Sequence, residues 1–116
     1  QKLDEADRIL FFAPVYFYNI PGSMKVVLDR LQVCWAAAVR GDRPSADKKG
    51  GIILVGGAPE SPRQFDGAIQ TLRYMLEDLG AACTDVVTMG GSDKAGLSDR
   101  PDIQHALETL AQKLKA

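Results

Sequence analysis

Three short segments of the chain are rich in apolar residues and too short to form helices of their own. They cover residues 8–13, 51–55 and 84–89. The segment 51–55 is apolar without alternation, which is typical of a strand that helices cover on both faces of a parallel sheet. These segments therefore predict three strands of a largely buried sheet.

Each predicted strand is followed by a longer segment whose apolar residues recur at helical spacing. These segments are residues 23–39, 63–79 and 101–115. Gly41 and Gly80 are suited to end the first two helices. The predicted inner faces consist of Met24, Val27, Leu28, Leu31 and Trp35 in the first helix, Phe65, Ile69, Leu72, Leu76 and Leu79 in the second, and Ile103, Leu107, Leu110 and Leu114 in the third.

The connecting segments are polar. Residues 1–6 have the character of a last helical turn, and residues 41–50 are predicted to form a polar surface loop. Gly22 or Ser23 is suited to cap the first long helix. The chain also begins without a methionine and inside what looks like a helix end, which suggests that it is a piece of a longer protein.

The alternation of strand and helix predicts an α/β fold in which residues 1–116 form one partial domain. The pattern fits the last three strands and helices of a doubly wound parallel sheet with strand order 2-1-3-4-5. The first two strands of that order are then missing, so we expect the strand at 8–13 to present an open apolar edge. We also expect a further segment to cover that edge.

Composition excludes several classes of protein. The 116 residues are 46% hydrophobic with a net charge of −1, so bulk charge indicates no nucleic-acid partner and no anionic membrane partner. No apolar run approaches the length of a membrane span, and the polar start QKLDEADRIL is no signal peptide. Cys34 and Cys83 are far apart and form no CxxC motif, which indicates reduced thiols in the cytoplasm.

An aromatic segment follows the first predicted strand, at the edge where parallel sheets bind ligands. Large flat side chains can form a wall for another flat ring, and backbone amides and the side chain of Asn19 can donate to the edge of that ring. The alternative is that these rings only cover the end of the sheet. The candidate ligand-binding residues are Pro14, Val15, Tyr16, Phe17, Tyr18, Asn19 and Ile20.

A second candidate segment, GGAPES at residues 56–61, follows the second predicted strand. Glycine allows a backbone to approach a ligand closely, so Gly56, Gly57 and Ala58 are candidate binding residues. The alternative is a glycine turn between strand and helix. No metal site, Gly-x-Ser-x-Gly motif, P-loop or dinucleotide fingerprint is visible in the sequence, and no catalytic residue is predicted.

Residues 14–30, PVYFYNIPGSMKVVLDR, resemble the flavin-binding segment of the flavodoxin-like NAD(P)H-dependent FMN reductases. The Pro-x-Tyr, the Pro-Gly, Lys25 and the pair Asp29-Arg30 fall at the spacing of that family. The resemblance continues more weakly through residues 56–61 and 65–80. The Ser/Thr-rich loop with which the family binds the FMN phosphate has no counterpart in this sequence.

The resemblance implies a flavodoxin-like fold and FMN as cofactor, bound through the two candidate segments. It implies an oxidoreductase that uses NAD(P)H as substrate and reduces a quinone, a flavin or another small-molecule acceptor, with the chemistry supplied by the cofactor. It also implies a homodimer or homotetramer. Three alternatives stay open: a flavodoxin-type electron carrier, a truncated chain that binds no cofactor, and a phosphorelay receiver domain, which the absence of an aspartate at a strand end disfavours.

Overall fold

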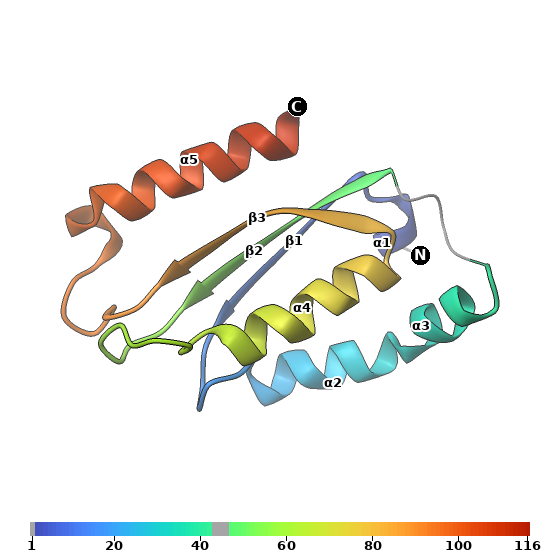
Figure 1. Cartoon of the computed structure of the whole chain (residues 1–116), viewed down its shortest axis with the longest axis horizontal. Helices are drawn as coiled ribbons and strands as arrows, with labels where there is room; N and C mark the ends of the chain where they lie inside the picture. The colour runs from blue at the N-terminus through green and yellow to red at the C-terminus, as the bar shows by residue number, and fades with distance from the viewer. Residues whose placement is uncertain (1, 43–46) are drawn as a thin grey trace.

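The computed structural model describes residues 2–42 and 47–116, and shows one sheet of three parallel strands in the order β1-β2-β3 (Figure 1). The strands are β1 (Arg8–Pro14), β2 (Lys48–Val55) and β3 (Ala81–Met89). Helices flank the sheet on both faces. The predicted α/β class and the partial doubly wound arrangement are therefore confirmed.

The middle strand begins with residues that the sequence placed in a surface loop. Residues 48–50 belong to β2, and Lys48 is buried because its ammonium group donates to the carbonyls of Leu3 and Asp4 at 2.6 and 2.8 Å. The predicted loop at 41–50 is therefore wrong over these residues, and its residues 43–46 lie outside the described part of the chain. The same contacts hold the short helix α1 (Lys2–Glu5), which confirms the predicted helix end.

Two adjacent glycines of β2 let helices approach the sheet from opposite faces. A Cβ atom at Gly50 would lie 2.8 Å from Leu76 of helix α4 (Asp66–Asp78), and one at Gly51 would lie 2.9 Å from Leu110 of helix α5 (Pro101–Lys115). The strand register shifts at this pair, so the pairing with β3 is irregular there. A side chain at either glycine would push a helix away from the sheet.

The last two long helices follow the predicted pattern closely. The predicted inner residues of α4 and α5 are buried or packed against the core. Helix α4 begins at Asp66 instead of residue 63, because Arg63 has a φ of +66° that no helix accommodates. Gly80, with a φ of +75°, follows its end as predicted, and a short 3₁₀ helix, η1 (Leu97–Asp99), precedes α5.

The predicted helix at 23–39 is two helices. Helix α2 (Gly22–Arg30) is followed by Leu31, whose amide donates to the carbonyls of Val27 and Leu28. Helix α3 (Gln32–Val39) starts directly after Leu31. Of the predicted inner face, Leu28 is buried, whereas Val27 and Trp35 are half exposed. The residue before α2 is Pro21, and no side chain caps the helix, so the predicted cap is wrong as well.

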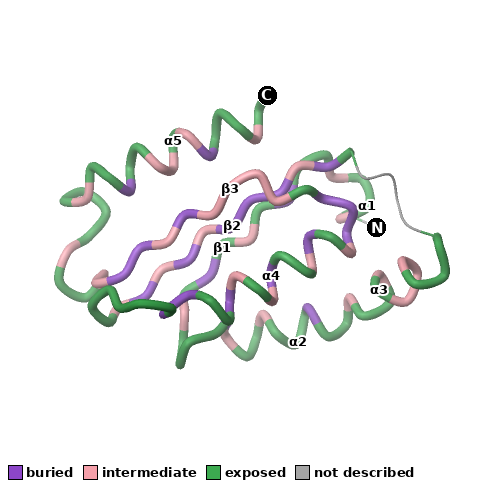
Figure 2. Tube along the Cα trace, in the orientation of Figure 1, coloured by how far each residue is buried: buried purple, intermediate pink, exposed green. Residues whose placement is uncertain are grey.

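The two faces of the sheet are covered unequally (Figure 2). The larger core lies between the sheet and α4 with α2, and includes Ile52, Leu54 and Leu72, which are fully buried. The face toward α5 has a smaller core, and there Leu10 and Phe12 of β1 remain 48% and 67% exposed. No strand within the described residues pairs with the outer edge of β1. The open apolar edge is therefore as expected.

Among the described helices, none combines the length and the apolar character that crossing a bilayer requires.

Candidate functional site

The loops that follow β1 and β2 leave the same edge of the sheet (Figure 1) and line a common pocket of about 220 Å³. The loop after β1 contributes Val15, Phe17 and Tyr18. The loop after β2 contributes the three residues 56–58. Ser61 and Gln64 complete the lining. The structure thus brings together six of the ten candidate residues from two segments that are about forty positions apart in the sequence.

Residues 16–19 form a tight turn that projects from the sheet edge. The backbones of Tyr16 and Asn19 are paired by two hydrogen bonds of 2.9 and 3.2 Å. The two central residues, Phe17 and Tyr18, have φ values of +48° and +64°. Two successive positive φ values are the signature of a type I′ turn, which ordinarily carries Asn-Gly. We call residues 16–19 the aromatic turn.

The aromatic turn is strained and exposed at once. A positive φ is uncommon for a bulky residue and costs free energy, and such strain clusters at ligand sites. Phe17 is 95% exposed, and its ring meets that of Tyr18 edge to face, with 5.8 Å between the ring centres. The rings therefore gain little from burial in the protein to offset the strained backbone. They do not lie in the apolar interior, as the covering role would require.

Four candidate residues of the first segment do not line the pocket. Pro14 is the last residue of β1, and Ile20 is buried in the larger core. Tyr16 and Asn19 use their amides to close the turn, and the side-chain oxygen of Asn19 accepts from the amide of Ile20 at 2.8 Å. The predicted donor role of these amides is therefore wrong for residues 16 and 19, while the amides of Phe17 and Tyr18 have no hydrogen-bond partner among the described residues.

The loop after β2 is held by the loop after β3. The carbonyls of Gly56, Gly57 and Ala58 accept from the amides of Ser92, Asp93 and Gly91 at 3.1, 3.4 and 2.7 Å. We call residues 56–58 the braced loop. The amide of Gly56 donates to Met89 of β3, but the amides of the other two residues have no hydrogen-bond partner in the described part of the chain.

Neighbouring side chains crowd the glycines of the braced loop. A Cβ atom at Gly57 would lie 2.5 Å from a carboxylate oxygen of Asp93, and one at Gly56 would lie 3.0 Å from the side-chain nitrogen of Gln64. The buried side chain of Gln64 also joins the loop together, because it accepts from the amide of Ser61 and donates to the carbonyl of Ala58. No periodicity or motif in the sequence singles out Gln64 or Asp93.

The pocket has donors, rings and no charged group. Four of its lining residues offer backbone amides without a partner among the described residues, two from the aromatic turn and two from the braced loop. No acidic or basic side chain of the described residues lines it. Such a site suits the edge of a flat ligand that is rich in hydrogen-bond acceptors. At about 220 Å³ it is smaller than a typical pocket for a whole cofactor, so it can hold one end of such a ligand.

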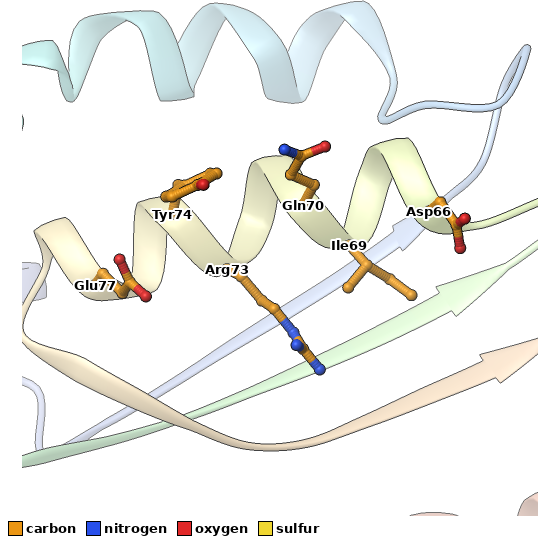
Figure 3. Close-up of a pocket in the computed structure, with 6 residues that line it drawn as sticks. All are labelled: Asp66, Ile69, Gln70, Arg73, Tyr74 and Glu77. Atoms are coloured by element: carbon orange, nitrogen blue, oxygen red, sulfur yellow. The ribbon is translucent and has the colours of Figure 1, made fainter. Parts of the chain in front are cut away.

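A second hollow of about 330 Å³ lies along helix α4 (Figure 3). Its lining comes from successive turns of that one helix and mixes both signs of charge, with Asp66, Arg73 and Glu77 among the residues drawn. It shares no lining residue with the pocket between the two loops. Across residues 2–42 and 47–116, no three His, Cys, Asp or Glu side chains lie close enough to hold a metal ion.

Known proteins resemble this chain over most of its length. The FMN-dependent NADH:quinone oxidoreductase of Parafrankia sp. (strain EAN1pec) is 30% identical over 95 residues, which cover 77% of this chain and 45% of that protein. The chain thus spans less than half the length of the curated relatives it matches.

Two solved structures share the arrangement of strands and helices. An FMN-dependent NADH-azoreductase from Bacillus anthracis str. Ames Ancestor, solved with FMN, has a TM-score of 0.67 at 12% identity and covers 98% of this chain and 59% of its own. A thermophilic tryptophan halogenase from Streptomycin violaceusniger has a TM-score of 0.65 at 26% identity and covers 92% of this chain and 67% of its own. Proteins that share this fold are thus named for different activities.

The model of the family described as having the flavodoxin-like fold matches residues 1–114. Because this match extends over nearly the whole chain, the chain belongs to the flavodoxin-like fold family.

Proposed function

We propose that this chain forms part of the FMN site of an NAD(P)H-dependent oxidoreductase that reduces a small acceptor such as a quinone. The observation that carries the proposal is the set of four amides that have no partner among the described residues and lie beside two exposed rings in one pocket. The isoalloxazine ring of FMN is flat and carries its acceptors along one edge. The donor set and the aromatic wall fit that ring, and the size of the pocket fits its pyrimidine end.

Each segment has a distinct part in this proposal. Phe17 and Tyr18 form a wall against the plane of the ring, and the amides of Gly57 and Ala58 donate to its edge. Bound FMN would supply the transfer of hydride from NAD(P)H to the acceptor. The lining residues that the structure describes carry no charged side chain, and their part in the proposal is to orient the ring.

The relatives support this proposal. The Parafrankia protein is named for an FMN-dependent reaction of NADH with a quinone, and the Bacillus azoreductase was solved with FMN. The pocket described here lacks a phosphate-binding loop, so we propose that residues outside these 116 bind the phosphate of FMN. The free thiols of Cys34 and Cys83 agree with a reducing compartment, and we propose a cytoplasmic location.

We also propose that the protein forms a homodimer or homotetramer. Several large apolar side chains are exposed on the helices α2, α3 and α4, on the side away from the smaller core. Trp35 and Val39 of α3 border one hollow together with Tyr74 of α4. Exposed apolar patches of this kind mark protein interfaces. Analytical ultracentrifugation of the wild type and of Trp35→Glu tests this, since the variant should dissociate if the patch is the interface.

The decisive experiment uses the longest natural polypeptide that contains this sequence. The purified protein, reconstituted with FMN, should show flavin absorption that bleaches on anaerobic addition of NADH or NADPH and returns when a quinone is added. Bound flavin that neither nucleotide bleaches would point to an electron carrier. Protein that takes up no FMN would contradict the proposal.

A further inference from the structure

Arg100 lies just before helix α5 and reaches back to the loops that follow β2 and β3. Its guanidinium donates to the carbonyl of Gly90 at 3.1 Å and lies 3.6 Å from a carboxylate oxygen of Glu60. It also forms two hydrogen bonds, each of 3.2 Å, with the carboxylate of Asp102. Only 22% of its side chain is exposed, against 65% for Arg40 in its own ion pair with Asp42.

Glu60 completes the contact from the other loop. Its carboxylate accepts from the amide of Gly90 at 3.4 Å, and its Cγ atom would lie 2.4 Å from a Cβ atom at that position. Glu60 thus binds the amide of Gly90 and Arg100 binds its carbonyl, and these two side chains also form an ion pair with each other. We call Glu60, Gly90, Arg100 and Asp102 the arginine clamp.

The arginine clamp borders the braced loop on both sides. Glu60 comes two residues after Ala58, and Gly90 directly precedes Gly91, whose amide binds the carbonyl of Ala58 at 2.7 Å. The clamp thus holds the two chain segments whose mutual hydrogen bonds orient residues 57 and 58. The bidentate pair of Arg100 with Asp102 fixes the orientation of the guanidinium that binds Gly90 and pairs with Glu60.

We propose that Arg100 is a positioning residue for the ligand of the pocket: through the arginine clamp it holds the amides of Gly57 and Ala58 at the edge of the flavin. This inference rests on the proposed function. Arg100 touches no residue of the aromatic turn in the described contacts, so its effect reaches the flavin only through the braced loop. Donors at the ring edge favour its electron-rich form, so Arg100 also raises the reduction potential of bound FMN.

The test compares three variants of the longest natural polypeptide that contains this sequence. Arg100→Ala removes the clamp, Arg100→Lys keeps the charge without the planar fork, and Arg40→Ala removes an exposed arginine of another ion pair at the end of α3. The dissociation constant of FMN is measured by fluorescence quenching, and the midpoint potential of the bound flavin by reductive titration. Unfolding temperatures are measured without FMN.

Arg100→Ala should weaken FMN binding about tenfold, the effect of losing one well-placed hydrogen bond to the ring. It should also shift the midpoint potential of the flavin to more negative values. Arg100→Lys should lie between this variant and the wild type, and Arg40→Ala should match the wild type in both measurements. If Arg100→Ala does not fold, the FMN affinity and midpoint potential of Arg100→Lys and Glu60→Gln are compared with those of the wild type, and both variants should show the same losses to a smaller extent.

Two results would overturn the inference in different ways. A wild type that binds FMN while the clamp variants keep its affinity and potential would show that Arg100 only stabilises the fold, and would leave the proposed function intact. A wild type that binds no FMN would overturn the proposed function and this inference with it.

Discussion

The two segments that meet at the pocket are built in opposite ways. The aromatic turn projects into solvent, and its two central residues have backbone conformations that aromatic residues rarely adopt. The braced loop lies against a neighbouring loop, and its three carbonyls are all bound. One segment is strained with little support from the rest of the protein, and the other is supported by several hydrogen bonds and by the arginine clamp.

This difference separates the features of the pocket that serve the fold from those that do not. Packing inside the protein explains the glycines of the braced loop, so their presence alone says little about a ligand. Packing does not explain Phe17 and Tyr18, whose rings are exposed and whose backbone is strained. A residue that costs stability without contributing to the core is a stronger pointer to binding than one that the core requires.

The largest loss of stability is expected from a substitution at Gly90, beside the braced loop. A Cβ atom at Gly90 would lie 2.4 Å from Glu60 Cγ and 3.2 Å from the side-chain oxygen of Gln64, so Gly90→Ala should lower the free energy of unfolding by about 1–3 kcal/mol. Urea denaturation measures this. Gly96→Ala is the matched control, since a Cβ atom there meets nothing within 4 Å. Equal stability of the two variants would contradict the packing described for Gly90.

Substitutions in the aromatic turn should change the free energy of unfolding in the opposite direction. Replacing the turn by Phe17→Asn with Tyr18→Gly gives it the residues that a type I′ turn prefers, and should raise the free energy of unfolding by about 1–2 kcal/mol. The same change should weaken FMN binding because it removes both rings. A control with Phe17→Ala and Tyr18→Ala should lose the affinity without the gain in stability. A loss of stability in the Asn-Gly variant would show that the turn is not strained.

The smallest effect is expected in acid, at the arginine clamp. The hydrogen bond from the Arg100 guanidinium holds the pKa of Asp102 below the ordinary aspartate value of about 3.9. Because the folded-state pKa is the lower one, this pair stabilises the fold fully above that ordinary value, and the contribution is lost as the pH falls through the lowered pKa. NMR titration of the Asp102 carboxyl group should show its pKa rising in Arg100→Ala and unchanged in Arg40→Ala.

The order of strands and helices could be predicted from the sequence because it follows from the positions of the apolar residues. The apolar runs at residues 51–55 and 84–89 lie inside β2 and β3, and the stripes from Phe65 to Leu79 and from Ile103 to Leu114 face the core. The errors arose where particular contacts mattered more than the pattern of apolar residues. Lys48 extends β2 because two carbonyls of α1 accept from it, and the helix break at Leu31 leaves no trace in the spacing of apolar residues.

The pocket was only partly predictable. The sequence placed two candidate ligand-binding segments at the carboxyl ends of the first two strands, and the structure joins residues from both in one pocket. It could not show that Tyr16 and Asn19 close a turn, because that depends on the φ angles between them. Nor could it show Gln64, Asp93 or Arg100, whose partners lie in loops that meet only after the sheet has formed.

The packing of Gly56 and Gly57 has a consequence for how relatedness is interpreted. Neighbouring side chains crowd these glycines, so a glycine at either position serves the packing of two loops whether or not a ligand binds beside them. Two proteins with the same residues at positions 17 and 18 would therefore be better candidates for a shared ligand than two proteins that match only at these glycines.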